Sequence, residues 1–207
     1  MKVAIINYGM GNLGSVRRAL DDLGVDVFIA EHPSALFEAN RFVLPGVGSF
    51  SEGMRRLRAG GWIDPMRRLV QVERRPLLGI CLGMQMLAVA GDEGGTDEGL
   101  GFLDGRVRRL DELGCALRIP HVGWNDVTFP AGEPLFAHVP QHTDFYFVHS
   151  YAVETTHAKD ISASTVYGTQ VVAAVRHGDV FGTQFHPEKS SRAGRQVLRN
   201  FLDYMPC

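Results

Sequence analysis

The sequence predicts an α/β protein with a mostly parallel central sheet, helices flanking that sheet, and a β-rich second half. In the first 90 residues, apolar runs that do not alternate with polar residues are separated by segments with helical spacing. Strands without alternation are typical of a parallel sheet that is covered on both faces. From residue 94 to residue 184 the apolar segments become shorter and extended. A chain of 207 residues is long enough for one well-buried core, so we expect one domain, residues 1–207.

The first half should contain four buried strands, at residues 3–6, 25–30, 42–44 and 77–81. Apolar residues at helical spacing predict a first helix through residues 16–23, which Gly24 closes. A short helix is expected over residues 33–39, and another over residues 63–70 with Asp64 as its N-cap and Pro65 at its first position. The fourth strand should lead into a helix through Met84, Leu87 and Ala88.

In the second half, extended segments are expected at residues 106–110, 127–129, 145–153, 171–175 and 180–185. The last two should be joined by a hairpin turn at residues 177–179. A final helix is indicated by Val197, Leu198, Phe201 and Leu202, with Ser190 or Ser191 as its cap.

Charge and composition argue against several classes of function. The net charge of −2 offers no electrostatic basis for binding nucleic acid or an anionic membrane. The longest apolar stretch, residues 77–90, is interrupted by glycine and glutamine and is too short to span a bilayer. Three scattered cysteines show no metal or redox spacing. We therefore expect a cytoplasmic protein.

Residues 9–14, Gly-Met-Gly-Asn-Leu-Gly, match the G-x-G-x-x-G pattern of dinucleotide-binding loops. A buried strand precedes the pattern, a helix follows it, and Glu31 ends the next strand. A dinucleotide-binding oxidoreductase is therefore one candidate function. This candidate leaves the cysteine and histidine motifs described next without a role.

Cys81 lies between a buried strand and a helix in the segment Gly79-Ile80-Cys81-Leu82-Gly83. This is the cysteine counterpart of the G-x-S-x-G nucleophile elbow, in which the glycines relieve crowding at a sharp turn. The sulfur would project at a helix N-terminus, where the partial positive charge favours a thiolate. A nucleophile is the sharper interpretation, and a buried structural cysteine is the alternative.

His186-Pro187-Glu188 supplies a candidate base for that nucleophile. Proline forces the preceding residue into an extended conformation, and residues i and i+2 of an extended chain face the same side. Glu188 could then hold one nitrogen of His186 while the other faces the thiol. The alternative for this tripeptide alone is a surface histidine beside a solvated glutamate.

Acyl transfer also needs N–H donors for the developing oxyanion. One candidate is the amide of Leu82, directly after the nucleophile. The other is the glycine-rich turn Pro45-Gly46-Val47-Gly48, which follows the third strand. An ordinary turn at the end of a strand is the alternative for that segment.

With these motifs, G-x-C-x-G-x-Q and H-P-E, the chain resembles the class I, triad-type glutamine amidotransferases, which implies their flavodoxin-like fold. Within that superfamily, several stretches are similar to the glutaminase subunits of imidazole glycerol phosphate synthase. They are "YGMGNLGS", "LPGVGSF", "GICLGMQML", "HVGWN", "YFVHSY" and "FHPEKS". The resemblance runs from residue 8 to residue 190. A glutaminase of another pathway is the alternative within the superfamily.

The resemblance implies that Cys81 attacks the carboxamide of glutamine, His186 moves the protons and Glu188 orients His186. It also implies substrate contacts from Gln85, Glu93, His149, Ser150 and Tyr151. For Glu93, a solvated charge in an acidic loop is the alternative. No cofactor and no metal are implied, and we reject a zinc site at His138 and His142 because they lie in a loop without an H-E-x-x-H pattern.

The resemblance further implies a (β/α)₈-barrel cyclase partner that receives ammonia from this chain. The cyclase would form imidazole glycerol phosphate and an aminoimidazole carboxamide ribotide in histidine biosynthesis. Asn12, Trp124, Tyr146 and Lys189 match positions at or near the subunit interface. The segment Pro45-Gly46-Val47-Gly48 lacks the second consecutive glycine of many amidotransferases, and the β-branched Val47 should resist a peptide flip there. We therefore expect the isolated chain to hydrolyse glutamine poorly.

Overall fold

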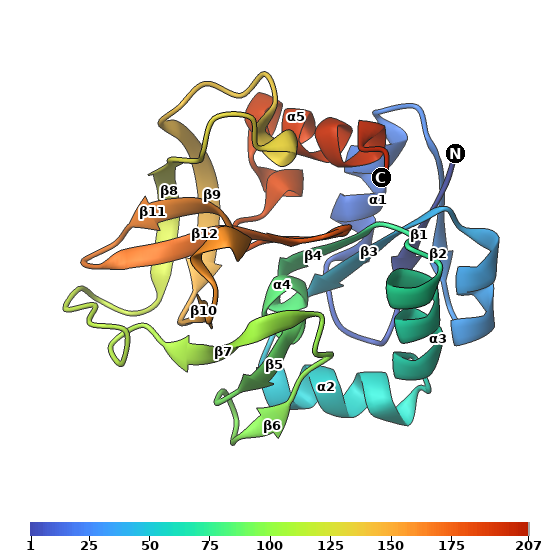
Figure 1. Ribbon diagram of the computed structural model, residues 1–207, viewed down its shortest axis with the longest axis horizontal. Helices are drawn as coiled ribbons and strands as arrows, with labels where there is room; N and C mark the ends of the chain where they lie inside the picture. The colour runs from blue at the N-terminus through green and yellow to red at the C-terminus, as the bar shows by residue number, and fades with distance from the viewer. Residues whose placement is uncertain (207) are drawn as a thin grey trace.

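A seven-stranded sheet runs through the centre of the computed structural model, which describes residues 1–206 (Figure 1). Five neighbouring strands are parallel, and two antiparallel strands extend one edge. This mostly parallel sheet confirms the predicted fold class. In spatial order its strands are β11 (Ile161–Val166), β12 (Gln170–His177), β13 (Val180–Thr183), β4 (Leu77–Cys81), β3 (Arg41–Gly46), β1 (Lys2–Ile6) and β2 (Asp26–Ala30).

Helices cover both faces of this sheet, which explains why its strands are apolar without alternation. Val3 and Ile5 of β1 pack in one cluster with residues of α1 (Leu13–Asp21) and α5 (Ser191–Asp203). Ala4 and Ile6 of the same strand pack in the other, with α2 (Phe50–Ala59) and α3 (Ile63–Arg67). Figure 1 shows α1 and α5 together on one side of the sheet and α2 on the other.

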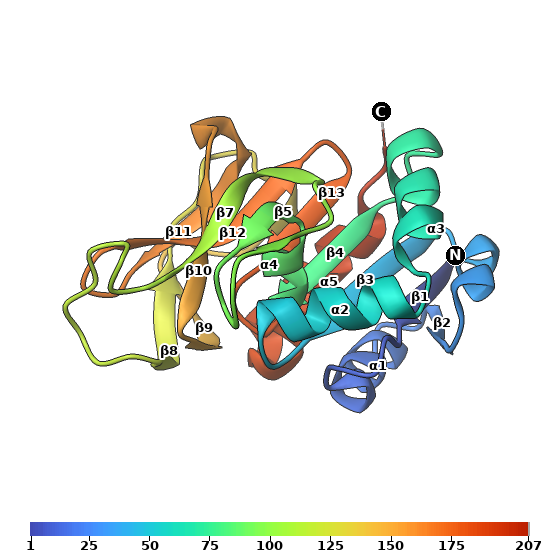
Figure 2. The same ribbon diagram turned by 90° about the horizontal axis from the view of Figure 1, so that it is seen from below.

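Most strands of two further sheets come from the β-rich second half. One is a four-stranded sheet in the order β10 (Tyr151–Thr155), β7 (Leu103–Arg109), β5 (Ala88–Gly91) and β6 (Asp97–Glu98). The other is an antiparallel ribbon of β8 (His121–Val127) and β9 (Thr143–His149), in which Trp124 lies opposite Tyr146. Figure 2 shows the ribbon at the end of the molecule where β11 and β12 lie. Short connecting helices are η1 (Pro33–Glu38), η2 (Arg68–Val72), η3 (Pro134–Phe136), η4 (Ala158–Asp160) and η5 (Pro187–Lys189).

Several predicted helices differ from the observed ones. Helix α2 has no counterpart in the prediction. The helix after Cys81, α4 (Leu82–Met86), has only five residues, and Ala88 begins strand β5 instead of continuing the helix. Ala88 pairs with Leu103 of β7, so a contact with a later strand overrides the local helical pattern. Asp64 lies in the first turn of α3, whose N-cap is Trp62, so the predicted cap was wrong.

The extended segments also differ in their limits. The predicted strand 145–153 is divided at Ser150, because β9 pairs with β8 whereas β10 pairs with β7. The strand expected at residues 127–129 is instead β8, which lies almost entirely before that segment. Strand β11 was not predicted. The hairpin turn after His177 is present and connects β12 to β13, as expected.

Candidate active site

Cys81 is the last residue of β4 and directly precedes α4, so it occupies a sharp turn from strand to helix. Its backbone has φ 55° and ψ −110°, in a region that side-chain-bearing residues rarely adopt. The two flanking glycines have a steric cause. A Cβ atom on Gly83 would lie 1.8 Å from the carbonyl oxygen of Leu44, and one on Gly79 would lie 2.6 Å from the backbone of Gly83. The elbow therefore needs both glycines for close backbone approach.

Cys81 is buried, and its sulfur takes part in two hydrogen bonds. The sulfur lies 3.8 Å from the carbonyl oxygen of Val148, to which the thiol can donate. The side-chain amide of Gln184 donates to the sulfur at 3.7 Å. Neither residue is among the predicted site residues, although Gln184 lies only two positions before His186.

His186 and Glu188 form a buried pair. Nδ1 of His186 lies 2.8 Å from Oε1 of Glu188, and the two side chains are 3% and 1% exposed. His186 is extended, as expected before proline, but Glu188 lies in the 3-10 turn η5. The predicted pairing is therefore present, whereas the predicted reason, a fully extended chain, was wrong.

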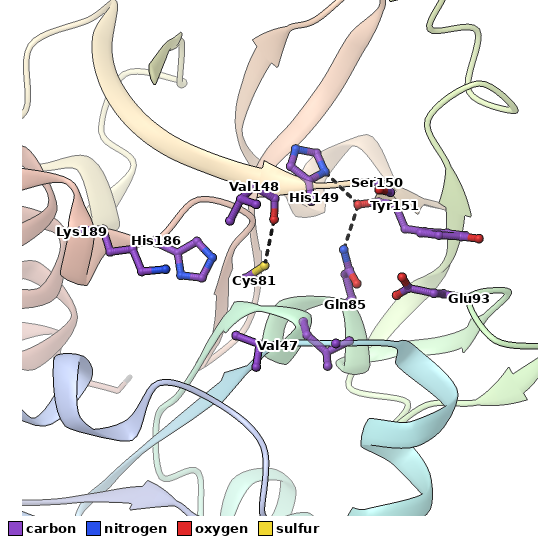
Figure 3. A pocket seen from close by; sticks show the side chains of 12 residues that line it. Val47, Cys81, Gln85, Glu93, Val148, His149, Ser150, Tyr151, His186 and Lys189 are labelled. Carbon is purple, nitrogen blue, oxygen red and sulfur yellow. Dashed lines mark hydrogen bonds between the residues drawn. The ribbon is translucent and has the colours of Figure 1, made fainter. Parts of the chain in front are cut away.

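The second ring nitrogen of His186, Nε2, is available to groups in the pocket. Nε2 is buried and makes no hydrogen bond within the described residues, and Figure 3 shows the ring beside Cys81. Burial opposes a charge on this imidazole, but its interactions with Cys81 and Glu188 outweigh burial and raise the pKa of His186 to about 9.

Ser190 holds the backbone around His186. Its hydroxyl donates to the carbonyl oxygen of His186 at 2.7 Å and accepts from the backbone N–H of Tyr146 at 3.0 Å. Ser190 occupies the N-cap position of α5, one of the two predicted, but its side chain makes no capping hydrogen bond. The hydroxyl instead joins the histidine segment to strand β9.

All the predicted substrate and oxyanion residues meet Cys81 and His186 in one pocket (Figure 3). Its volume of about 230 Å³ lies below the usual range of drug-sized ligand sites, which suits a single amino acid. Glu93 is half-buried, accepts from the backbone N–H of Phe50 at 3.2 Å, and has its pKa raised by burial. It is therefore more than a solvated surface charge. The lining residues are Val47, Gly48, Cys81, Leu82, Gln85, Glu93, Val148, His149, Ser150, Tyr151, His186 and Lys189.

Strand pairing brings the glycine-rich turn to the nucleophile. Gly46 at the end of β3 is the register partner of Cys81 at the end of β4. Val47 and Gly48 consequently follow at the same edge as Leu82. Leu82 is the first residue of α4, where backbone N–H groups have no partner inside the helix. Val47 is 44% exposed.

Three of the four predicted interface residues form a row beside the pocket. Trp124 is 54% exposed, which excludes a core position, and its ring lies 6.1 Å from that of Tyr146 in an edge-on arrangement. The Nζ atom of Lys189 lies 5.8 Å from the Tyr146 ring. Asn12 lies elsewhere, as the exposed N-cap of α1, and its side chain accepts from the N–H of Ser15.

The Gly9 to Gly14 loop is packed against the protein. Arg56 donates to the carbonyl oxygen of Gly9 at 2.8 Å, and a Cβ atom on Gly11 would lie 3.3 Å from Pro45. Gly14 has open space around its Cα. The first two glycines therefore serve a tight turn against neighbouring segments.

Two general features concern the described part of the chain. Within residues 1–206, no three His, Cys, Asp or Glu side chains are arranged to hold a metal ion. In the same residues, no helix combines the length and the apolar character that crossing a membrane requires.

Comparison with known proteins places this site in a family. The model of the class-I glutamine amidotransferases matches residues 4–205. The chain is 45% identical to "Imidazole glycerol phosphate synthase subunit HisH" of Moorella thermoacetica over 96% of this chain and 93% of that protein. The protein of the same name from Bacillus subtilis is 46% identical over 96% of this chain and 94% of its own length.

A solved structure described as a glutamine amidotransferase has the same fold. It has a TM-score of 0.76 and 20% identity, and the match covers 97% of each chain. The family model and the near full-length relatives show that the chain belongs to the class-I glutamine amidotransferase family of enzymes and, within it, to the family of imidazole glycerol phosphate synthase HisH subunits.

Proposed function

We propose that this chain is the glutaminase subunit of an imidazole glycerol phosphate synthase in histidine biosynthesis, acting as one domain over residues 1–207. The observation that carries the proposal is the meeting of Cys81, the His186–Glu188 pair, Gln85 and Glu93 in one pocket of single-amino-acid size. The relatives' names supply the enzyme, imidazole glycerol phosphate synthase, and the fact that they are subunits of it.

In the proposed reaction, the sulfur of Cys81 attacks the side-chain carbonyl carbon of glutamine. The thiol proton passes to Nε2 of His186, which then donates it to the departing nitrogen, so that ammonia leaves and a glutamyl thioester remains. Water, deprotonated by the same nitrogen, cleaves the thioester to glutamate and restores the thiol. Glu188 holds Nδ1–H of the ring and stabilises the imidazolium between these steps.

The pocket suggests how glutamine would be oriented. Figure 3 shows Glu93 at the end of the pocket away from His186, with Cys81 and Gln85 between them. Glu93 would receive the amino group, so that the carboxamide lies at the sulfur. His149, Ser150 and Tyr151 form the opposite wall. The oxyanion would take N–H groups from Leu82 and from the segment containing Val47 and Gly48.

We further propose that ammonia passes to a (β/α)₈-barrel cyclase subunit, which docks on the row of Trp124, Tyr146 and Lys189 and on the edge that carries Asn12. Trp124 provides the large exposed aromatic surface typical of an interface anchor. The β-branched Val47 would keep the isolated chain poorly active until the partner and its ligand shift this segment.

The experiment is glutamate formation from glutamine, with and without the cyclase subunit and its nucleotide ligand, for the wild-type chain and for Cys81→Ala. We expect slow hydrolysis by the isolated chain, strong activation in the complex, and no activity in the variant. Unchanged activity of Cys81→Ala would refute the proposal. Activation only by the synthase of another pathway would assign that pathway, and saturable NAD binding that is independent of Cys81 would favour the dinucleotide alternative.

A further inference from the structure

We infer that His121 and Asn125 are positioning residues of the glutamine pocket, because they fix His149 and, through it, the carbonyl group that holds Gln85. The inference rests on the glutaminase function proposed above. Neither residue lines the pocket. Both belong to the "HVGWN" segment, in which only Trp124 has a predicted role.

Strand β8 separates two sets of side chains. His121 and Asn125 lie four residues apart and therefore on the same face of the strand, whereas Val122 and Trp124 point the other way and are 55% and 54% exposed. His121 is buried, with its ring stacked between Phe147 at 4.7 Å and Tyr167 at 4.0 Å. This stacking fixes the plane of the imidazole.

The hydrogen bonds of this cluster admit one placement of the hydrogens. Nδ1 of His149 lies 2.9 Å from the carbonyl oxygen of Tyr151, which can only accept, so the hydrogen of a neutral His149 is on Nδ1. Nε2 of His149 must then accept, and it lies 3.0 Å from Nδ1 of His121. His121 therefore also carries its hydrogen on Nδ1.

The outer end of the chain of hydrogen bonds agrees with this placement. Nε2 of His121 must accept, and the side-chain nitrogen of Asn125 lies 3.3 Å away. The same nitrogen donates to the carbonyl oxygen of Val166 at 3.0 Å, which fixes the orientation of the amide. The donors therefore run in one direction, from Asn125 through His121 and His149 to Tyr151.

Both imidazoles are neutral near pH 7. Burial lowers the pKa of His121 to about 4 and, with smaller effects of His121 and His186, lowers the pKa of His149 to about 3. A second proton on His149 would place two N–H groups against each other at the His121–His149 contact. The neutral state of both rings therefore preserves the direction in which the hydrogen bonds run.

The inner end of this series of hydrogen bonds is connected to the reacting sulfur. The carbonyl oxygen of Tyr151 accepts a second hydrogen bond, from Nε2 of Gln85 at 2.8 Å (Figure 3). Gln85 also donates to Gln184 at 3.0 Å, and Gln184 donates to the sulfur of Cys81 at 3.7 Å. Removing His121 would leave Nε2 of His149 buried without a donor, and the wall formed by His149 to Tyr151 would lose its alignment.

The test compares His121→Phe, which keeps a ring for stacking, with His121→Asn, whose amide nitrogen lies close to the position of Nδ1. Glutamine hydrolysis is measured in the complex with the cyclase subunit and its ligand. We expect His121→Phe to raise KM for glutamine about tenfold with kcat changed less than about threefold. His121→Asn should have a KM for glutamine close to that of the wild type. His157→Phe, at an exposed histidine outside the pocket, should match the wild type.

A purely structural role gives a different result, because partial unfolding lowers kcat through the fraction of active enzyme and leaves KM unchanged. That outcome, or an unchanged KM in His121→Phe, would overturn the inference. A second measurement uses nitrogen NMR of the isolated chain, where both His121 and His149 should carry their hydrogen on Nδ1 near pH 7. An Nε2–H form of His149 would also overturn it. If the wild-type complex hydrolyses no glutamine, the proposed function fails, while the NMR result still decides whether the chain of hydrogen bonds exists.

Discussion

His186 and Glu188 are joined through Nδ1 and Oε1 at 2.8 Å, within a stretch of only three residues. Pro187 starts the turn that folds Glu188 back against the ring, and Ser190 then ties the carbonyl group of His186 to strand β9. The pair is thus assembled locally but held in place by a distant strand. Because the pair is buried, Glu188 has a strong influence on the protonation of His186.

Replacing Glu188 by glutamine should lower the pKa of His186. The carboxylate is one of two groups that raise this pKa to about 9, so the variant's pKa should shift down toward the ordinary value near 6.5. An NMR titration of the His186 ring measures this directly. We also expect kcat to fall about 100-fold or more, since the imidazolium loses its charged partner.

An unchanged His186 titration in Glu188→Gln would contradict this assignment. Glu133→Gln is a suitable control, because Glu133 is also partly buried and does not line the pocket. It should leave the titration of His186 unchanged.

Two glycine-to-alanine changes should move stability in opposite directions. Gly83→Ala places a Cβ atom 1.8 Å from the backbone oxygen of Leu44, so we expect a loss of about 3 kcal/mol or more in unfolding free energy. Gly14→Ala lies in α1 with nothing within 4 Å of the new Cβ, and it should stabilise by about 0.5 to 1 kcal/mol. Urea denaturation of both variants measures these changes. Equal destabilisation by the two variants would contradict the assignment of Gly14 as sterically free.

The buried imidazoles should make the protein sensitive to acid. His121 and His149 take up protons in the unfolded chain below about pH 6.5 but resist them in the folded chain until about pH 4 and pH 3. The unfolded state therefore binds more protons in this interval, and stability falls as pH falls through it. Each group contributes a slope of about 1.4 kcal/mol per pH unit.

His121→Asn removes one of these two groups. Between pH 6 and pH 4.5 its unfolding free energy should decline less steeply than that of the wild type, by about 1.4 kcal/mol per pH unit. Denaturation with urea at several pH values provides the comparison. A wild-type slope in His121→Asn would refute neutral burial of His121.

Trp124→Ala should weaken binding of the cyclase subunit about 30-fold, as expected for an exposed aromatic anchor. The unfolding free energy should change by less than about 0.5 kcal/mol, because the side chain lies outside the core. Titration calorimetry with the cyclase subunit measures the affinity. Val72→Ala is the control. It changes an exposed apolar residue that precedes β4, whose other end carries Cys81, and the variant should bind the cyclase subunit normally. Normal binding by Trp124→Ala would place the interface elsewhere.

The sequence by itself determined the features whose causes are local. Unbroken apolar runs predicted strands that are buried on both faces, and such burial is typical of a parallel sheet between helices. The glycines at positions 79 and 83 predicted the sharp turn at Cys81, and Pro187 predicted the extended backbone of His186. These features depend on residues within a few positions of one another, so they are visible in a short segment.

Only the tertiary structure decided the features that depend on distant partners. Ala88 became a strand residue because β7 lies beside it, and Ser150 divides two strands because they join different sheets. Gln184 reaches Gln85 across 99 positions and His121 reaches His149 across 28. Their roles depend on hydrogen-bond geometry between separate strands, and geometry between separate strands leaves no periodic pattern or local composition in the sequence.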